Sequence, residues 1–409
     1  MEKTISVTTQ HIIEEEEKYS AHNYHPLPVV LSKGEGVFVW DVEGKKYYDF
    51  LSAYSAVNQG HSHPKIVAAL VDQAHTLALT SRAFHNDVFY KFSKYITSYF
   101  GFDKVLPMNT GAEAVETALK LSRKWGYEKK GIPANKARII FCQNNFHGRT
   151  ITIISASNDP DATKNFGPFT PGISSIPYND LEALKKELED PNIAAFVVEP
   201  IQGEAGVYVP EDGFLKKSYD LCKSKNVLFV ADEVQTGIAR TGKLIACDHE
   251  GIKPDILILG KAVSGGVYPV SCVLANNEVM DVIHPGEHGS TFGGNPIACR
   301  VAMAALEVVK DEKLAERSEY LGEILRRELR AIKSDLISVV RGKGLLNAIV
   351  VKPKNGKEAW DVCLKLRDNG LLAKPTHGDI IRFAPPLIIT KEQLMECVDI
   401  IRKSILEME

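Results

Sequence analysis

The sequence predicts an α/β protein with a large domain, built on a mostly parallel sheet covered by helices, and a smaller α+β domain. Two observations support this prediction. Between about residues 138 and 275, short runs of β-branched and other apolar residues alternate with helical patterns, which is typical of a parallel sheet with helices on both faces. After Gly294 the pattern changes to long helical stretches separated by short strands. With 409 residues, the chain is long enough to form more than one hydrophobic core.

The N-terminal part is expected to begin with an acidic helix over residues 10–20. An irregular loop rich in Asn, His and Pro follows over residues 21–28. Residues 37–48 alternate between apolar and polar side chains and predict a hairpin that turns at Glu43 and Gly44. Apolar residues then recur at helical spacing, which predicts helices over residues 64–79, 87–99 and 110–125.

The strands of the large domain are predicted from short apolar runs bounded by turn residues. They are expected at residues 138–142, 151–155, 194–199, 227–232, 255–259 and 270–275. Later in the chain, helices are expected at residues 296–310, 313–332, 357–369 and from 391, with strands at residues 337–340, 345–351 and 380–383. We therefore expect three segments: residues 1–49, which pack with the small domain, residues 50–294, which form the large domain, and residues 295–409, which form the small domain.

The composition excludes several classes of function. With 25% charged residues and a net charge of -3, the chain lacks the basic excess of a nucleic-acid-binding protein. No apolar run is long enough to span a bilayer. The acidic residues 14–17 are unlike a signal or transit peptide, and seven scattered cysteines without a CxxC pair indicate reduced thiols. We expect a cytoplasmic protein, and a mature mitochondrial form stays open as the alternative.

Two of the apolar runs each end in one charged residue. One run ends at Asp232, and the other ends at Lys261 before a turn of small residues. Such runs are typical of strands buried on both faces of a parallel sheet, and ligands bind where those strands end. Pyridoxal phosphate needs this pair, because a lysine forms a Schiff base with its aldehyde and an aspartate keeps its ring nitrogen protonated. The sequence therefore predicts a pyridoxal-phosphate enzyme.

Two further motifs admit two interpretations each. Residues 109–113 open a helix with a small-residue turn, which is either a phosphate site or a capping motif with Thr110 as the cap. Phe146 and Arg149 follow a predicted strand. They are either contacts to a cofactor ring and a carboxylate, or a core phenylalanine and a surface arginine.

Other charged residues are informative to different degrees. Glu204 lies in a Gly-rich loop after a buried strand, where a carboxylate is either functional or only solvated. Arg382 interrupts an apolar run and needs an acidic partner, because an unpaired buried charge is very costly.

His61 and His63 have a spacing seen in metal sites, but no further ligands are apparent, so we expect a turn and no metal. The chain has neither GxGxxG nor GxxxxGK[ST], which argues against dinucleotides and nucleoside triphosphates.

Taken together, the motifs resemble those of the class III aminotransferases of fold type I. The resemblance extends from about Tyr19 to the C-terminus. It implies that the large domain, residues 50–294, binds pyridoxal phosphate. The motifs around the lysine and the aspartate are shared by the superfamily, whereas the tyrosine-bearing N-terminal motifs are similar to those of enzymes that act on ornithine. The matching motifs are AHNYHPLP, SAYSAVNQGH, NTGAEA, NFHGRT, VEPIQGEAG, ADEVQTG, GKAVSGG, GEHGSTFGGNP, GLLAKPTHG and IRFAPPL.

The resemblance implies roles at the cofactor ring. Lys261 would form the Schiff base and then move the proton between the substrate and the cofactor. Asp232 would pair with the ring nitrogen and Gln235 with the ring hydroxyl oxygen, while Phe146 would stack on the ring.

Roles at the cofactor phosphate are implied in the same way. Gly111 and Ala112 would offer backbone N–H groups to the phosphate. Ser290 and Thr291 would reach the phosphate of the neighbouring subunit, which implies a homodimer with composite sites.

The implied reaction transfers the δ-amino group of L-ornithine to 2-oxoglutarate by a ping-pong mechanism, giving glutamate 5-semialdehyde and L-glutamate. Tyr24 and Arg149 would hold the distal end of ornithine, with Tyr54 lining the pocket. Arg382 would bind the α-carboxylate of 2-oxoglutarate. Glu204 would mask Arg382 in the first half-reaction and swing away in the second.

Rival functions remain within and outside this family. N-acetylornithine, 4-aminobutyrate or lysine as the amine donor would use the same Lys261 and Asp232. A protein that keeps the fold only as a binding module is a further alternative, although the intact lysine and aspartate argue against it.

Overall fold

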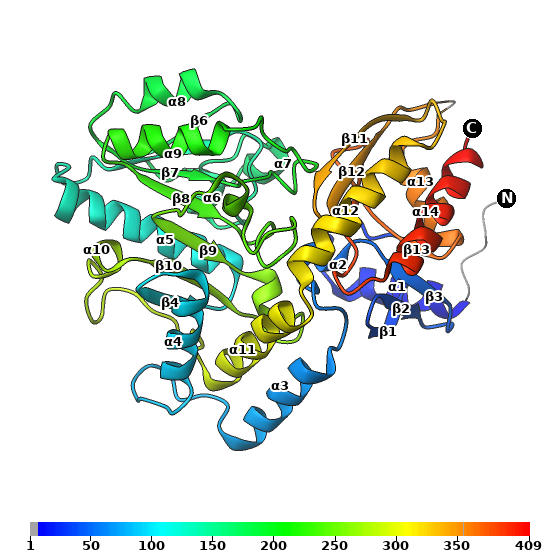
Figure 1. Cartoon of the computed structure of the whole chain (residues 1–409), viewed down its shortest axis with the longest axis horizontal. Helices are drawn as coiled ribbons and strands as arrows, with labels where there is room; N and C mark the ends of the chain where they lie inside the picture. The colour runs from blue at the N-terminus through cyan, green and yellow to red at the C-terminus, as the bar shows by residue number, and fades with distance from the viewer. Residues whose placement is uncertain (1–6, 355) are drawn as a thin grey trace.

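The computed structural model describes residues 7–354 and 356–409 and has two lobes (Figure 1). One lobe contains a seven-stranded sheet and the other contains two four-stranded sheets. The long helices α11 (Pro296–Asp311) and α12 (Leu314–Arg330) pass from the first lobe to the second (Figure 1). Residues 1–6 of the predicted N-terminal segment lie outside the described residues.

The large sheet has the strand order β4-β10-β9-β8-β7-β5-β6. β10 is antiparallel to both of its neighbours, and the strands from β5 to β9 pair in parallel. The predicted mostly parallel sheet is therefore confirmed. The strands are β4 (Lys104–Met108), β5 (Arg138–Cys142), β6 (Ile173–Ile176), β7 (Ile193–Val198), β8 (Leu228–Asp232), β9 (Ile256–Leu259) and β10 (Ser271–Ala275).

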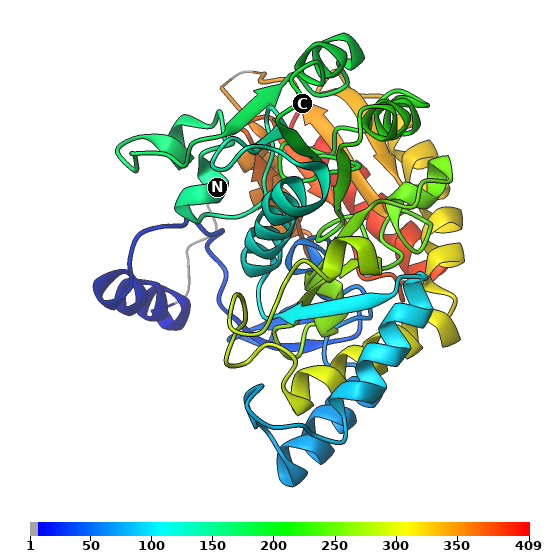
Figure 2. The same ribbon diagram turned by 90° about the vertical axis from the view of Figure 1, so that its left-hand side faces the viewer.

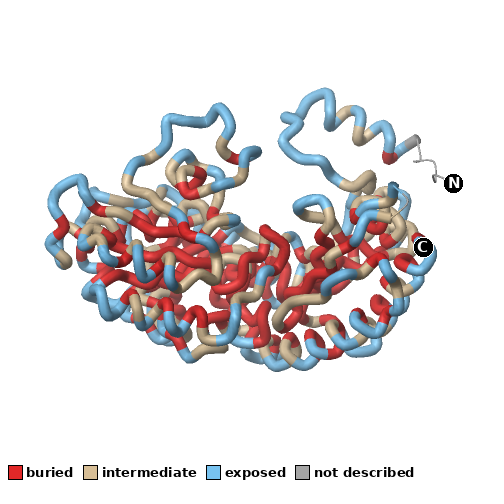
Figure 3. The backbone as a smooth tube through the Cα atoms, turned by 90° about the horizontal axis from the view of Figure 1, so that it is seen from above, coloured by how far each residue is buried: buried red, intermediate tan, exposed pale blue. Residues whose placement is uncertain are grey.

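Alternate residues of the central strands face two different hydrophobic cores. In β8, Leu228 and Val230 belong to the core under helix α5 (Gly111–Trp125), whereas Phe229 and Ala231 belong to the core on the other face. Every residue of β7 and β8 is buried, and Figure 3 shows the buried backbone concentrated inside each lobe. Because both faces of these strands are covered, their sequences are continuous apolar runs.

Helices surround this sheet and extend below it (Figure 1). α3 and α4 pack against α11, and α9 packs against β8. The helices of this lobe are α3 (Pro64–Thr76), α4 (Phe89–Phe100), α6 (Ile151–Ile154), α7 (Pro160–Thr163), α8 (Leu181–Glu187), α9 (Phe214–Ser224) and α10 (Asn277–Met280), with a π-helical turn at Gly126–Lys130 and 3-10 turns at Ala246–Glu250 and Lys261–Ser264.

The prediction of a strand at residues 151–155 is wrong, because Ile151–Ile154 form the helical turn α6. The hydroxyl of Thr150 caps this turn by accepting a hydrogen bond from the N–H of Ile153 at 3.3 Å. β-branched residues favour a strand, but the cap and the burial of Ile153 in the core under α5 override that preference. The patterns also missed the short strands β4 and β6.

The second lobe contains the sheets β1-β2-β3-β13 and β11-β12-β15-β14. The predicted hairpin is confirmed, since β2 and β3 pair antiparallel and Gly44 in the turn has a φ of 81°. β3 also pairs with β13 in parallel, which supports the proposal that the N-terminal segment packs with the small domain. The elements are β1 (Leu31–Glu35), β2 (Phe38–Asp41), β3 (Lys46–Asp49), α2 (Ser52–Ser55), β11 (Ile337–Lys343), β12 (Leu346–Val351), α13 (Ala359–Asp368), β13 (Leu371–Leu372), β14 (Pro375–Thr376), β15 (Ile380–Phe383) and α14 (Lys391–Leu406).

Helix α1 (Val7–Tyr19) projects from the molecule (Figures 2 and 3), and the hydroxyl of its buried Thr9 donates a hydrogen bond to the Glu43 carboxylate in the turn between β2 and β3. The segment after it, up to β1, is largely exposed. Among the residues that the structure describes, no helix is both long and apolar enough to cross a membrane.

Candidate active site

Four neighbouring parallel strands of the large sheet end at one edge, and each is followed by functional side chains. Asp232 is the last residue of β8, Glu199 follows β7, and Lys261 follows β9 after a single glycine. Phe146 and His147 lie in the loop after β5. Because the carboxyl ends of parallel strands meet at one edge, these residues come together where such sheets bind ligands. They line a pocket of about 190 Å³ together with Gly111, Ala112, Gly148, Ile201, Glu204, Val234, Gln235 and Thr236.

The amine of Lys261 is enclosed by the pocket, although part of its side chain reaches the pocket surface. Burial lowers the pKa of Lys261 to about 8, with Glu204 opposing this change and Arg382 adding to it. A lysine with this pKa is neutral often enough near pH 7 to act as a nucleophile or base. Its backbone has a φ of 44°, in the left-handed region that L-residues rarely adopt.

A buried histidine supports the aspartate. Nδ1 of His147 lies 2.6 Å from Oδ2 of Asp232, and the N–H of Val234 donates to Oδ1 at 3.0 Å. Burial opposes protonation of His147, but its hydrogen bond to Asp232 and the charge of that carboxylate raise the pKa of His147 above its usual value. The two hydrogen bonds hold the Asp232 carboxylate in one orientation at the pocket wall.

Glu199 is a second buried carboxylate at this edge. Its Oε1 accepts a hydrogen bond from the N–H of Phe146 at 2.9 Å, which holds the loop that contains both Phe146 and His147. Burial raises the pKa of Glu199 to about 7, with His147 opposing this change and Asp232 adding to it. The group can therefore gain or lose a proton close to neutral pH.

The N-terminus of α5 forms another side of the pocket. The hydroxyl of Thr110 accepts a hydrogen bond from the N–H of Glu113, and the Glu113 carboxylate accepts one from the N–H of Thr110. The first N–H groups of a helix have no acceptor within the helix, so those of Gly111 and Ala112, which line the pocket, are available to an anion. The capping and phosphate interpretations of this turn are thus compatible.

The side chain of Gln235 also lines this pocket. It packs so closely over Gly203 that a Cβ there would lie 1.8 Å from Oε1 of Gln235. A glycine is therefore needed at position 203 to leave Gln235 in the pocket.

An ion pair joins the pocket to the second lobe, because Glu204 lines the pocket and its partner Arg382 lies on β15. Nη1 of Arg382, on β15, lies 2.8 Å from Oε2 of Glu204. Arg382 is buried, whereas the Glu204 side chain is 31% exposed. The acidic partner predicted for Arg382 is therefore Glu204, and the carboxylate is the member of the pair with room to move.

Tyr54 lies between the lysine and this ion pair. Its ring centroid is 5.9 Å from Nζ of Lys261 and 4.7 Å from Cζ of Arg382. Tyr54 belongs to α2, a left-handed turn in which Ser52, Ala53, Tyr54 and Ser55 have φ values of 50°, 45°, 59° and 76°. Oδ1 of Asp49 accepts hydrogen bonds from the N–H groups of Leu51 and Ser52. Asp49 thus anchors the turn that positions Tyr54.

A larger outer hollow of about 590 Å³ shares Phe146 and Glu204 with the inner pocket. Arg149 lines it and is exposed, with Cζ 5.0 Å from the Phe146 ring centroid. Burial raises the pKa of Tyr54, and one smaller contribution comes from Tyr24, which places Tyr24 near Tyr54. Tyr24 itself is 77% exposed. Of these three predicted substrate contacts, Arg149 lines the outer hollow, whereas Tyr24 and Tyr54 line neither hollow.

Ser290 and Thr291 line neither of these hollows. Oγ of Ser290 accepts a hydrogen bond from Nδ2 of Asn109 at 2.8 Å, next to the N-terminus of α5. Thr291 is exposed. Neither residue therefore lines the pocket of its own chain, unlike the other predicted cofactor contacts Gly111, Ala112, Phe146, Asp232, Gln235 and Lys261.

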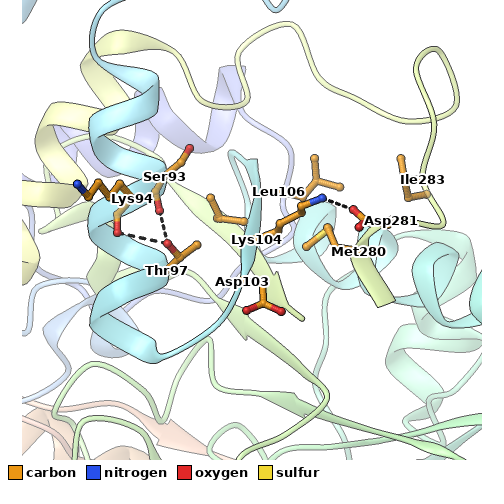
Figure 4. Close-up of a pocket in the computed structure, with 10 residues that line it drawn as sticks. Ser93, Lys94, Thr97, Asp103, Lys104, Leu106, Met280, Asp281 and Ile283 are labelled. Atoms are coloured by element: carbon orange, nitrogen blue, oxygen red, sulfur yellow. Dashed lines mark hydrogen bonds and ion pairs between the residues drawn. The ribbon is translucent and has the colours of Figure 1, made fainter. Parts of the chain in front are cut away.

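Another hollow of about 460 Å³ lies between α4, β4 and the segment after α10 (Figure 4). Lys104 and Asp281 form an ion pair there, and the hydroxyl of Thr97 donates to the carbonyl of Ser93 at 2.7 Å. Asp103 accepts a hydrogen bond from the N–H of Asn277. This hollow therefore lacks the convergence of a lysine and buried carboxylates that marks the strand-end pocket.

Sequence patterns gave no role to His147 or Glu199. His147 and Asp232 are 85 residues apart, so no local spacing relates them. The signal that could have found both residues is their position directly after predicted strands, the same signal that identified Lys261.

Comparisons with known proteins point in one direction. The family model described as Aminotransferase class-III matches residues 19–405. The mitochondrial ornithine aminotransferase of Drosophila melanogaster is 67% identical over 96% of this chain and 91% of its own length. A crystal structure of the ornithine aminotransferase from Toxoplasma gondii has a TM-score of 0.96 and 52% identity, covering 99% of this chain and 96% of that chain. A crystal structure of an acetylornithine aminotransferase from Elizabethkingia anophelis has a TM-score of 0.90 and 66% identity, covering 98% and 99%.

Proposed function

The chain belongs to the class-III aminotransferases, and from this premise we propose that it transfers the δ-amino group of L-ornithine to 2-oxoglutarate. The observation that carries the proposal is the buried Arg382, paired at 2.8 Å with the movable Glu204 beside an enclosed lysine. A cation that can be masked and unmasked suits a site that must accept two differently charged substrates in turn. The identity to enzymes named ornithine aminotransferase supports the same substrate.

The residues of the pocket fit pyridoxal phosphate. An enclosed amine, a buried carboxylate and helix N–H groups suited to a phosphate meet in one pocket. When bound, this cofactor supplies an aldehyde carbon and an electron-accepting ring. Lys261 would hold the cofactor through its amine and later carry a proton to and from the substrate carbon. Asp232, held by His147 at 2.6 Å, would keep the ring nitrogen protonated, with Phe146 stacked on the ring and Gln235 bonded to its hydroxyl oxygen.

The phosphate would lie at the N-terminus of α5, bound by the N–H groups of Gly111 and Ala112. We propose that Ser290 and Thr291 of one subunit contact the phosphate bound by its partner in a homodimer. Their absence from the pocket of their own chain is consistent with this arrangement. We also propose a cytoplasmic location, with a mature mitochondrial form as the alternative; the seven free, buried cysteines fit either reducing compartment.

The two half-reactions of a ping-pong mechanism would use different parts of the site. Ornithine would place its δ-amine at the aldehyde carbon that the cofactor supplies, next to Lys261, while Tyr24 and Arg149 would bind its distal amino and carboxylate groups and Tyr54 would line the path between. In this half-reaction Glu204 neutralises Arg382, so Arg382 does not attract the ornithine carboxylate. In the second half-reaction Arg382 binds the α-carboxylate of 2-oxoglutarate. Glutamate 5-semialdehyde and L-glutamate are the products.

N-acetylornithine is a second candidate amine donor, because the Elizabethkingia anophelis structure described as an acetylornithine aminotransferase is 66% identical. An acetylated α-amine carries no positive charge and keeps a single N–H donor, whereas a free protonated amine has three donors and a charge. If Tyr24 and Tyr54 recognise the free amine, ornithine should react with the higher kcat/KM. Comparing the two donors under the same conditions decides between the candidates.

The direct test is a half-reaction with L-ornithine and no keto acid. We expect the visible band of the bound cofactor to disappear while o-aminobenzaldehyde gives the colour of a cyclised semialdehyde, because only δ-transfer makes that product. Loss of the band without this colour would indicate transfer of the α-amine and contradict the proposal. An unchanged band would indicate another amine donor.

Glu204→Ala is expected to raise the rate of the half-reaction with L-glutamate about tenfold and to reduce selectivity for the δ-amine of ornithine, because Arg382 then attracts α-carboxylates permanently. Stopped-flow measurement with each amino acid, with product analysis, provides the check. The matched control Glu211→Ala removes an exposed carboxylate that lines neither hollow. Unaltered selectivity in Glu204→Ala would contradict the masking role but not the general chemistry.

A further inference from the structure

Lys374 is a partly buried lysine directly beside the Glu204–Arg382 ion pair. In the antiparallel pairing of β14 with β15, Pro375 faces Ile381 and Thr376 faces Ile380. Continuing this register by one residue places Lys374 opposite Arg382. Residues directly opposite on antiparallel strands share one face of the sheet, so this register directs the side chains of Lys374 and Arg382 to the same face.

The electrostatics of Lys374 agree with this placement. Burial lowers the pKa of Lys374, with Glu204 opposing this change and Arg382 adding to it. Within the ranges 7–354 and 356–409, Lys374 forms no ion pair, whereas Arg382 holds Glu204 at 2.8 Å. Two adjacent cations therefore compete for one carboxylate. Like charges placed opposite each other on a sheet are destabilising. The carboxylate of Glu204 therefore stabilises both cations.

The Glu204 loop is fixed next to Lys374 by its backbone and not by its side chain. The hydroxyl of Thr376 donates a hydrogen bond to the carbonyl of Glu204 at 2.9 Å. This hydrogen bond holds the backbone of Glu204 at Thr376, which is two residues along the chain from Lys374. The partly exposed carboxylate of Glu204 can still rotate.

In the proposed second half-reaction, a substrate carboxylate takes the place of Glu204 on Arg382. The displaced carboxylate then needs a new partner, because a ligand can shift an equilibrium only by the difference in its interactions with the two states. We propose that Lys374 receives the Glu204 carboxylate when the α-carboxylate of 2-oxoglutarate binds Arg382. The inference rests on the proposed function, and it makes Lys374 a residue that sets specificity through Glu204.

Lys374→Gln is expected to raise the KM for 2-oxoglutarate about tenfold, which corresponds to about 1.4 kcal/mol, with kcat within twofold. The half-reaction with L-ornithine should stay within twofold of the parent, since Glu204 remains on Arg382 there. Lys374→Arg should restore most of the affinity. The holoenzyme variant should also bind glutarate, a dicarboxylate without a keto group, about tenfold more weakly in calorimetric titration. The matched control is Lys343→Gln, a half-buried lysine of the same sheet that lines neither hollow.

A double-mutant cycle separates an action through Glu204 from direct binding of the substrate. In the Glu204→Ala background, Lys374→Gln should change the KM for 2-oxoglutarate less than twofold. A tenfold effect that persists in this background would show that Lys374 binds the substrate itself and would overturn the inference. A single variant with the parent KM would overturn it as well.

The same preparations keep this inference separate from the proposed function. If the parent enzyme fails the L-ornithine half-reaction, the proposed function fails. If the parent passes and the Lys374 variants behave like the Lys343→Gln control, only the role of Lys374 fails.

Discussion

Lys261→Met should reduce transamination between L-ornithine and 2-oxoglutarate by about 10⁴-fold, the upper range for a positioned proton-transfer group. Methionine fills nearly the same volume but has no amine to hold the cofactor or to move a proton. Lys261→Arg should be equally impaired, because its guanidinium keeps the positive charge but stays protonated. Single-turnover measurements of glutamate 5-semialdehyde formation provide the check. Activity within tenfold of the parent in either variant would contradict the assignment of Lys261.

Stability of the apoprotein gives an independent test that the fold survives this change. Burial lowers the pKa of Lys261 from 10.5 to about 8, so the unfolded chain binds a proton more tightly than the folded chain. The protonation of this lysine therefore lowers the free energy of unfolding progressively as the pH falls from 10.5 to about 8. The full loss of stability is present below that pH. The Lys261→Met apoprotein should have the higher Tm at pH 7, and the difference should shrink at pH 10. A lower Tm at pH 7 would argue against an enclosed amine.

Asp232→Asn should reduce kcat by about 10²- to 10³-fold, which corresponds to about 2.7–4.1 kcal/mol of transition-state stabilisation. Asparagine is similar in size but cannot keep a ring nitrogen protonated. It would also leave His147 without the carboxylate that raises its pKa. Steady-state kinetics and the absorbance spectrum of the bound cofactor measure both effects.

The matched control for this variant is Asp220→Asn, which removes an exposed carboxylate paired with Lys216 on the surface of α9. This control should keep the parent kcat. If Asp232→Asn also stayed within tenfold of the parent, the carboxylate would not be acting on the ring nitrogen, and the pairing with His147 would be structural only.

The parts of the site that lie at strand ends could be predicted from the sequence. Asp232 and Lys261 each end a continuous apolar run, and the topology of a parallel sheet brings such ends together. Phe146 and Glu204 follow predicted strands in the same way. The acidic partner of Arg382 could be required from the cost of burying a charge, but its identity as Glu204 came from the family resemblance and agrees with the observed ion pair.

Other features depend on contacts that no local pattern encodes. Residues 151–155 have the composition of a strand, but the cap provided by Thr150 and the packing of Ile153 make them helical. The pairing of His147 with Asp232 joins the loop after β5 to the end of β8. The side-by-side placement of Lys374 and Arg382 follows from a strand register that pattern reading does not give.

The left-handed turn of Ser52–Ser55 limits how this chain can evolve. Each non-glycine residue in this conformation costs about 1–2 kcal/mol, against a total stability of typically about 5–15 kcal/mol. The anchoring hydrogen bonds to Asp49 offset part of this cost. A lineage that keeps the turn therefore tolerates fewer destabilising substitutions elsewhere. Where selection for the position of Tyr54 is relaxed, glycine should spread at these four positions before the rest of the fold changes.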